Sequence, residues 1–411
     1  MTSSQSQAPA ARRIAWSNGL QNIADELVSA KTILPWIFGA AGVPHVFTAL
    51  LVPIRESGSM LPQAALTPWV SIHAARKRLW LVGSVGQGLC ALGLAAAALL
   101  TKSWFLGVLS IVVLGFLSIF RALCSITGKD VQGRTISKGS RGLVTGRAAQ
   151  IGGAGTLITG VTLALFSPVP NWALAVVLGC GAIFWLLAAE IFRGIREPVP
   201  DTDTPERGID KHWLTDTWRL YSQEADFRAF VNVRALMLIT ALSTSFIVAL
   251  ASSSGHSALS GLAGFVLASG MASLIGGRIS GIWSDRSSKD VMSAGALAAS
   301  LTLLGVIACA AWAPAAVNAW ALPLGFFLVN LAHTFIRVAR KTYVVDMASG
   351  DRRTQYVGAA NTMMGLILLV LGAISAAVAL AGPIATLLFF ACVGLFGSYR
   401  ARALKDVSAP V

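Results

Sequence analysis

Long apolar stretches follow one another along most of the chain, and short polar breaks separate them. A helix that crosses a bilayer needs about 20 mostly apolar residues. Ten stretches of the sequence meet this requirement, at residues 78–100, 104–126, 141–166, 171–193, 227–250, 257–283, 290–312, 316–340, 355–380 and 383–399. The pattern therefore predicts an all-helical protein that crosses a membrane many times.

The region before residue 78 is ambiguous. Hydropathy alone selects a single helix there, at residues 33–53, and leaves the adjacent charges of Arg55 and Glu56 in a loop. On that reading the two charges stay in water, which avoids the cost of placing them in hydrocarbon.

An internal repeat favours two helices in this region instead. The segment FRALCSITGKD places Arg121 nine positions before Asp130, and IRVARKTYVVD places Arg337 nine positions before Asp346. Both motifs are followed by a basic segment and a helix of small residues, and the two copies lie 212 to 216 positions apart. Transferred to the N-terminal half, this offset predicts helices near 13–37 and 43–67. The repeat thus predicts twelve transmembrane helices, with the charged pair inside the second.

A long polar segment divides the predicted helices into six and six. Residues 194–226 contain three prolines and predict a cytoplasmic linker, between an N-terminal six-helix bundle at 1–193 and a C-terminal bundle with a short tail at 227–411. Within the linker, KHWLTDTWRLY is typical of an amphipathic helix lying on the membrane surface. Lys and Arg gather in the breaks on the side of the linker and both termini, so the positive-inside rule places that side in the cytoplasm.

Composition supports a membrane protein and excludes several other classes. The 411 residues are 55% hydrophobic and only 12% charged, with a mean hydropathy of +0.69. The net charge of +14 is spread over loops rather than one face, so we expect no nucleic-acid partner. The five cysteines lack metal-ligand spacing, and no phosphate-binding Gly-Lys-Ser/Thr loop occurs. We therefore expect no enzyme activity, no cofactor and no metal site.

Charged and polar residues inside the first two predicted helices are the main functional candidates. Such residues seldom face lipid, because a charge at the centre of a bilayer costs about 2.5–3.5 kcal/mol. The first helix carries Asn22, Asp25 and Glu26, and the second carries Arg55 and Glu56 at a similar depth. Antiparallel neighbours would pair Arg55 with Asp25 or Glu26, which leaves a carboxylate able to exchange a proton. The alternative is a permanent ion pair that only joins the two helices.

The C-terminal half carries a second set of candidates. Asn330, His333 and Arg337 recur at three- and four-residue steps, so they share one helix face. Arg234 lies about two turns into the seventh predicted helix. Gln150 and Asn361 occupy corresponding repeat positions, to within a residue. We expect these side chains to line the substrate and proton pathway, although a packing role for His333 is the alternative.

The repeated Arg-Asp pairs suggest a different role. Arg121 and Arg337 are expected near the cytoplasmic surface, and their partners Asp130 and Asp346 at the adjoining loops. The nine-residue spacing favours a gate or latch over substrate contact. For the two arginines, the alternative is that their long side chains reach back to the interface.

One cytoplasmic segment carries a resemblance to a known family. In GIWSDRSSKD, the residues Gly281, Asp285, Arg286 and Lys289 match the motif G-x-x-x-D-R-x-G-R/K-R/K of the major facilitator superfamily. The six-plus-six arrangement and the central linker resemble the same family. The resemblance implies a cytoplasmic latch that contains Asp285. The corresponding N-terminal segment, TPWVSIHAARKR, departs from the motif, because Ser71 stands where the aspartate would be.

These observations together predict a gradient-driven, proton-coupled transporter of a small polar or anionic solute. It would work by alternating access in the cytoplasmic membrane as a monomer, with solute, protons and membrane lipid as its partners. Two alternatives stay open at this point. One is a proton-coupled efflux antiporter for drugs or metabolites, and the other is a receptor or assembly scaffold that has the same fold without transporting.

Overall fold

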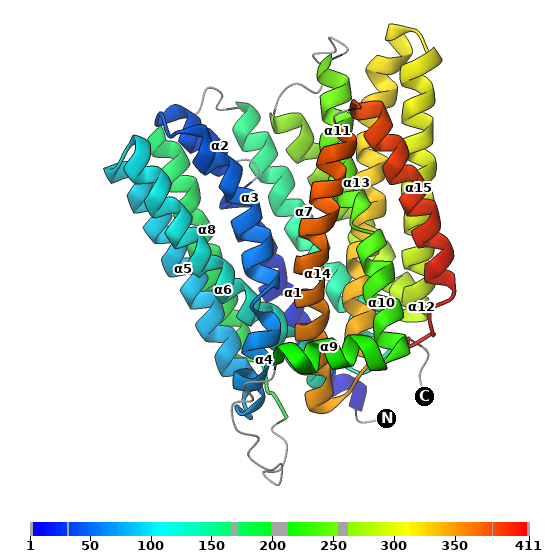
Figure 1. The fold of residues 1–411 in the computed structure, drawn as a ribbon. Helices are drawn as coiled ribbons and strands as arrows, with labels where there is room; N and C mark the ends of the chain where they lie inside the picture. The colour runs from blue at the N-terminus through cyan, green and yellow to red at the C-terminus, as the bar shows by residue number, and fades with distance from the viewer. Residues whose placement is uncertain are drawn as a thin grey trace. The chain divides into compact units, whose positions relative to one another are not determined.

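The computed structural model describes residues 3–30, 33–165, 171–198, 213–253, 262–379 and 381–408, and almost all of these residues are helical (Figure 1). The helices are α1 (Ser3–Leu27), α2 (Ile33–Ala40), α3 (His45–Met60), α4 (Gln63–Ser71), α5 (Arg76–Leu100), α6 (Ser103–Thr135), α7 (Arg141–Leu165), α8 (Asn171–Arg193), α9 (Trp213–Gln223), α10 (Ala225–Leu236), α11 (Ile239–Ser253), α12 (Leu262–Trp312), α13 (Ala315–Asp346), α14 (Gly350–Ala379) and α15 (Pro383–Arg402).

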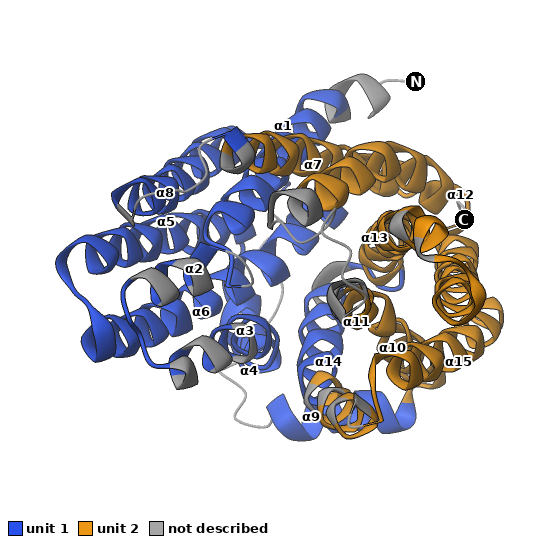
Figure 2. Ribbon diagram, turned by 90° about the horizontal axis from the view of Figure 1, so that it is seen from above, with its two compact units in different colours: residues 1–137, 165–223, 347–366 blue, residues 138–164, 224–346, 367–411 orange. Residues whose placement is uncertain are grey.

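The helices group into two compact units, which Figure 2 shows in blue and orange. Unit 1 comprises residues 1–137, 165–223 and 347–366, and unit 2 comprises residues 138–164, 224–346 and 367–411. Unit 2 therefore takes α7 from the first half of the chain, and unit 1 takes the beginning of α14 from the second half. The bundles predicted at 1–193 and 227–411 follow chain order instead, and they stay a prediction.

Unit 1 is built around α5, which packs against both α6 and α8. Helix α1 packs on α8, and α3 packs on α6. At one end of the unit Trp80 stacks on Phe192 with their ring centroids 3.8 Å apart, and both rings are buried. The outward faces of α5 and α6 are apolar, as a lipid-facing surface requires, with Leu89 61% and Val112 50% exposed.

Unit 2 is built around α12, which packs against α13 and α15. Ile247, Leu303 and Phe390 are fully buried in the core between α11, α12 and α15. Helix α12 bends at Ser287, whose φ of −156° and ψ of 101° are not helical. The bend falls between the two helices predicted at 257–283 and 290–312.

Within the described residues, eight helices are long and apolar enough to cross a membrane. The protein is thus a multi-pass membrane protein. The predicted total of twelve and the cytoplasmic position of the termini stay predictions. Helices α1 and α3 are not among the eight: α1 carries Asp25 and Glu26, and α3 has only 16 residues.

The first two predicted helices differ from the observed ones. Helix α1 ends at Leu27, whereas the prediction continued to residue 37, and α2 begins at Ile33. The helix predicted at 43–67 is divided into α3 and α4. The division falls at Pro62, which has no amide hydrogen to continue a helix. Arg55 and Glu56 lie inside α3, so the prediction that they belong to a helix rather than a loop is confirmed.

The amphipathic helix predicted in the linker is also present, as α9. Thr217 and Leu220 are buried, whereas Leu214 and Trp218 are 63% and 61% exposed, four residues apart on one face. Helix α9 packs against α4 within unit 1. Its exposed apolar face fits a helix that lies at a membrane interface.

Glycines bring α7 and α12 close together in unit 2. A Cβ added at Gly277 would lie 2.6 Å from the carbonyl oxygen of Gly146, and one added at Gly281 would lie 2.6 Å from that of Gly142. Both distances are too short for any side chain, so the two backbones meet directly. The small residues of α7 thus serve close helix contact.

Candidate functional site

Three helices of unit 1 bring charged residues together. Nη2 of Arg55 on α3 and Nη1 of Arg121 on α6 both contact Oδ1 of Asp25 on α1. The Arg55 side chain is 9% exposed, that of Asp25 is 19% exposed, and that of Arg121 is 38% exposed. One carboxylate thus holds two guanidinium groups, and Arg121 is the more accessible of the two. We call these three residues the Asp25 cluster.

Close packing of α3 on α6 positions the cluster. A Cβ added at Gly58 would lie 3.1 Å from Cβ of Ser118, one turn before Arg121. The hydroxyl of Ser118 lies 3.5 Å from the carbonyl oxygen of Arg55. Nη1 of Arg55 is buried and has no hydrogen-bond partner among the described residues. This nitrogen retains a donor for a ligand or a water molecule.

The other acidic candidates of this region lie beside the cluster. Glu56 is close enough to Arg55 and Arg121 for its charge to act on both. Glu26 and Asn22 are half-buried on α1, and each interacts with a neighbour in the described part of the chain. Two arginines are therefore balanced by Asp25 and Glu56, with Glu26 following Asp25 on α1.

Arg55 was predicted to pair with Asp25 or Glu26, and the contact with Asp25 confirms the first of these. For Arg121 the structure differs from the expectation. The sequence predicted a gate residue beside Asp130, whereas Arg121 contacts Asp25, which it shares with Arg55. The nine-residue spacing does not bring Arg121 and Asp130 together, because nine residues span two and a half helical turns and about 13 Å along the axis.

Asp130 instead forms a buried network at the end of unit 1. Its fully buried carboxylate lies 3.1 Å from Nε of Arg76, 2.8 Å from Nη2 of Arg134 and 3.6 Å from Nη1 of Arg353. Arg134 also approaches Glu197 at 3.4 Å, which extends the network to the chain beyond α8. Burial raises the pKa of the Glu197 carboxyl, against the opposing effect of a 2.8 Å hydrogen bond from the amide of Lys77. Ion pairs thus join α5, α6 and the start of α14 with the segment that follows α8.

Asp346 makes the corresponding contact in unit 2. Its carboxylate accepts a 2.6 Å hydrogen bond from Nη1 of Arg141, and both side chains are buried. Asp130 and Asp346 correspond in the repeat, as do Arg141 and Arg353. Each aspartate therefore holds the arginine at the start of the other half's small-residue helix.

Asp285 lies at the N-terminus of α7. Its two carboxylate oxygens accept hydrogen bonds from the amides of Gly142 at 2.6 Å and Leu143 at 2.7 Å. The first amides of a helix have no partner within the helix, and the helix dipole favours a negative charge there. Gly281, one turn earlier on α12, permits this approach. Arg286 is exposed and Lys289 half-buried, and their latch role stays a prediction.

Gln150 and Asn361 also occupy corresponding places. Nε2 of Gln150 on α7 donates to the carbonyl oxygen of Leu274 at 3.2 Å, and Nδ2 of Asn361 on α14 donates to Oε1 of Gln63 at 2.5 Å. Thr362, next to Asn361, accepts from the amide of Ala64 at 2.9 Å. Both amides join helices within their units, and their place in a solute pathway stays a prediction.

The polar face predicted on α13 has hydroxyl partners in unit 2. Nη2 of Arg337 lies 3.2 Å from the hydroxyl of Ser273, and Nδ1 of His333 lies 3.0 Å from that of Thr240. Asn330 lies 3.5 Å from the hydroxyl of Ser269 and donates to the carbonyl oxygen of Phe326 at 2.9 Å.

Arg234, the remaining candidate of the C-terminal half, makes none of the contacts described for the α13 face. Arg234 is buried in α10, two residues before the helix ends at Leu236. Within the described residues, no three His, Cys, Asp or Glu side chains gather as a metal site.

The helical fold described above is similar to that of solved transporters of the major facilitator superfamily. The similar solved structures include the fucose:proton symporter FucP of E. coli, at 15% identity and a TM-score of 0.71 over 98% of this chain and 100% of that chain. They also include the proton:xylose symporter XylE, at 12% identity and a TM-score of 0.75 over 99% and 98% of the two chains.

A bacterial homologue of the iron transporter ferroportin has the same fold, at 12% identity and a TM-score of 0.74 over 96% of this chain and 98% of that chain. No protein-family model and no curated protein matches the sequence. At such low identities the likeness establishes the fold, and the activity must be argued from the residues.

Sequence reasoning did not single out several residues of these clusters. Arg353 and Arg141 were visible as corresponding positions of the repeat, which was the available signal for their shared role. Arg76 appeared only within a basic run. Ser269 and Ser273, four residues apart on α12, gave no signal, because serines are common inside membrane helices.

Proposed function

We propose that the protein is a proton-coupled transporter that moves a small polar or anionic solute by alternating access. The observation that carries this proposal is the Asp25 cluster, in which one carboxylate on α1 holds arginines from both α3 and α6. The fold, which the chain has in common with solute:proton symporters, supports the same conclusion at the level of architecture.

In the Asp25 cluster, an anionic solute can replace the Asp25 carboxylate as the partner of the two arginines. Arg121 is 38% exposed along its side chain, and Nη1 of Arg55 is buried without a partner in the described part of the chain. A carboxylate or phosphate group of a solute forms strong, directional hydrogen bonds with guanidinium groups. Such a group can accept from both arginines and displace Asp25 from one of them.

Proton coupling follows from the same exchange. A desolvated carboxylate that loses a cationic partner binds a proton more readily. Binding of an anionic solute to Arg55 and Arg121 would therefore favour protonation at Asp25 or Glu56, and release of the solute would favour proton release. Solute and proton then move together, because each improves the binding of the other.

The proposed pathway set also includes polar residues of unit 2. His333, Asn330 and Arg337 lie on one face of α13 with hydroxyl partners on α11 and α12. Arg234, Gln150 and Asn361 complete the proposed pathway set. The proposal also places the protein in the cytoplasmic membrane as a monomer, with both termini inside, bundles at 1–193 and 227–411, and a gate made of Asp130, Asp285 and Asp346 with their basic neighbours.

The test is solute-dependent proton movement in proteoliposomes. The solute is first found by thermal stabilisation of the purified protein with a panel of mono- and dicarboxylates, neutral sugars and lipophilic cations. A ligand at 100 times its dissociation constant stabilises the folded state by about 2.7 kcal/mol. With the solute in hand, we expect gradient-driven uptake to fall at least tenfold in Asp25→Asn and Glu56→Gln, with exchange of solute less affected.

The matched control is Asp290→Asn, the same chemical change at an exposed aspartate of α12. It should keep full gradient-driven uptake. If Glu56→Gln and Asp25→Asn both keep full uptake, the coupling proposal is wrong. If lipophilic cations stabilise the protein and anions do not, the efflux antiporter replaces the anion carrier. If nothing is transported and neutralising the cluster has no effect, the non-transporting scaffold is favoured.

A further inference from the structure

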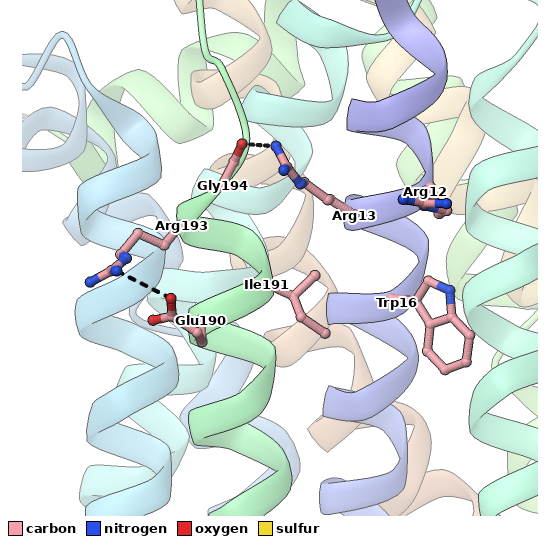
Figure 3. A pocket seen from close by; sticks show the side chains of 7 residues that line it. All are labelled: Arg12, Arg13, Trp16, Glu190, Ile191, Arg193 and Gly194. Atoms are coloured by element: carbon pink, nitrogen blue, oxygen red, sulfur yellow. Dashed lines mark hydrogen bonds and ion pairs between the residues drawn. The ribbon is translucent and has the colours of Figure 1, made fainter.

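A basic surface pocket lies between α1 and α8 in unit 1, apart from the Asp25 cluster. Its volume is about 640 Å³, and its lining includes Arg12, Arg13 and Trp16 on α1 with Glu190, Ile191 and Arg193 on α8 (Figure 3). Three arginines against one glutamate leave a net charge of +2. The function proposed above makes no use of this pocket.

Two of the three arginines of the pocket contact the C-terminal end of α8. Arg13 donates from Nη1 to the carbonyl oxygen of Gly194, directly beyond the C-terminus of α8 (Figure 3). Arg193 lies 3.2 Å from Glu190, one turn earlier on α8, and both side chains are at least 65% exposed. Arg12 is exposed next to Arg13. The pocket therefore presents guanidinium groups to its surroundings without burying them.

An aromatic side chain indicates the level of the pocket relative to the lipid headgroups. Trp16 lies four residues after Arg12, on the same face of α1, and is 48% exposed. Tryptophan is enriched at the level of lipid headgroups, because its ring is apolar and its N–H can bind polar groups. An arginine one helical turn beyond such a tryptophan lies at the height of lipid phosphates.

An apolar stripe leads from the pocket along α8. Ile183 and Leu187 are 56% and 48% exposed. They precede Glu190 and Gly194 at four-, three- and four-residue steps, so all four positions share one face of the helix. A free anion makes no favourable contact with such an apolar stripe, whereas an acyl chain can lie along it. The combination of basic pocket and apolar stripe therefore fits an amphiphile.

The pocket lies at the basic end of unit 1. Arg76 and Lys77 at the start of α5 donate their amides to Glu197, four residues beyond Arg193, so the starts of α1 and α5 and the end of α8 lie together. The positive-inside rule assigns this end to the cytoplasm. Anionic lipids are concentrated in the cytoplasmic leaflet, and basic pockets between transmembrane helices bind their headgroups.

We propose that the pocket between α1 and α8 binds the phosphate headgroup of an anionic phospholipid, with its acyl chain along Ile183 and Leu187. Arg12 and Arg193 flank the headgroup from either side of the pocket, Trp16 packs on the glycerol region, and Arg13 maintains the pocket through Gly194. The site stands independently of the transport proposal, because its ligand is a component of the membrane.

The test is binding of short-chain phosphatidylglycerol to the full-length protein in a neutral detergent. We expect the double variant Arg12→Ala/Arg193→Ala to bind this lipid at least fivefold more weakly than the unchanged protein. The control variant is Arg78→Ala, which removes an exposed positive charge from the same end of unit 1 but lies outside the pocket. It should change the dissociation constant less than twofold.

Two further measurements separate the sources of the phosphate and the roles of the residues. Inorganic phosphate and phosphatidylcholine should each bind at least tenfold more weakly than phosphatidylglycerol. Leu187→Ser should weaken the binding of phosphatidylglycerol and leave the binding of inorganic phosphate unchanged. Equal binding of inorganic phosphate would overturn the lipid assignment. If the Arg78 variant and the double variant lose the same affinity for phosphatidylglycerol, the lipid binds through non-specific charge and the proposed site is wrong. If the double variant loses no affinity, the proposal is refuted. Since the readout is lipid binding, failure here leaves the transport proposal intact, and the reverse also holds.

Discussion

The candidate pathway residues of the two units have different kinds of partner. In unit 1, α1, α3 and α6 bring Asp25, Arg55 and Arg121 into direct ionic contact. In unit 2, the corresponding face of α13 meets hydroxyl groups, as His333 does with Thr240. Ion pairs strengthen steeply as the local dielectric constant falls, whereas a neutral hydrogen bond contributes only about 1 kcal/mol.

This difference indicates a division of roles between the units. A group that changes charge can be controlled by neighbouring charges, and the Asp25 cluster in unit 1 supplies these. The hydroxyl groups that meet the α13 face carry no charge, and they can recognise the polarity of a solute. We therefore expect the free energy of unfolding and the proton dependence to be most sensitive to changes in unit 1.

The largest effect is expected at Asp130. Its buried carboxylate lies within 3.6 Å of three arginines, whereas Asp346 in unit 2 is paired with Arg141 at 2.6 Å. Asp130→Asn leaves buried positive charges without compensation, which should lower the free energy of unfolding by about 3–5 kcal/mol. Asp346→Asn should cost less, because one arginine loses its partner. Thermal unfolding of both variants in the same detergent measures the difference, and an equal or larger loss at Asp346 would break the comparison.

The second effect is expected at Asp25. Asp25→Asn removes the charge that holds Arg55 and Arg121, while the side chain keeps its size. Hydrogen bonds to charged groups contribute about 1.5–3 kcal/mol, so the loss should lie in that range. Thermal unfolding at two salt concentrations checks the origin of the loss. A partly buried pair is screened weakly, so the loss should be nearly the same at both concentrations.

Gly281→Val tests the packing on which unit 2 depends. A Cβ at this position would lie 2.6 Å from the carbonyl oxygen of Gly142, so α7 must move away from α12. Overpacking of this kind costs about 1–3 kcal/mol. The shift should also weaken the hydrogen bonds from Gly142 and Leu143 to Asp285. Gly305→Val on the same helix is the control, since a Cβ there meets nothing within 4 Å. Similar melting temperatures for the two variants would contradict this packing role.

The smallest effect is expected at Thr240. Thr240→Val keeps the shape of the side chain and removes its 3.0 Å contact with His333. We expect a loss of about 1 kcal/mol in the free energy of unfolding, because a neutral hydrogen bond is exchanged for an apolar contact. A loss as large as that of Asp25→Asn would show that the two units do not differ in the way that their contacts suggest.

Several parts of this structure were predictable from the chain alone. Hydropathy located the long helices, and the repeat correctly predicted a helix around Arg55. The antiparallel relation of the first two helices was enough to predict that Arg55 pairs with Asp25 or Glu26, and the structure selects Asp25. The position of Arg121 was not predictable in this way, because the repeat matched it with Arg337 and carried no information on α1.

The same limit applied to the gate. Asp130 and Arg353 are conspicuous in the repeat, but they lie 223 positions apart, and nothing in their spacing shows that they meet. Sequence reasoning paired each aspartate with the arginine nine residues before it on its own helix. The structure pairs each aspartate with an arginine that begins a small-residue helix from the other half of the chain.

The sequence by itself determined that this chain crosses a membrane, where its long helices run, and which polar residues lie inside them. It could do so because the thickness of a bilayer sets the length of an apolar helix, and every backbone polar group must be satisfied within that helix. Only the tertiary structure decided which charges meet. Ion pairing depends on distances of a few ångströms between side chains, and these distances follow from the packing of glycines, from breaks such as Pro62, and from the angles at which helices approach one another.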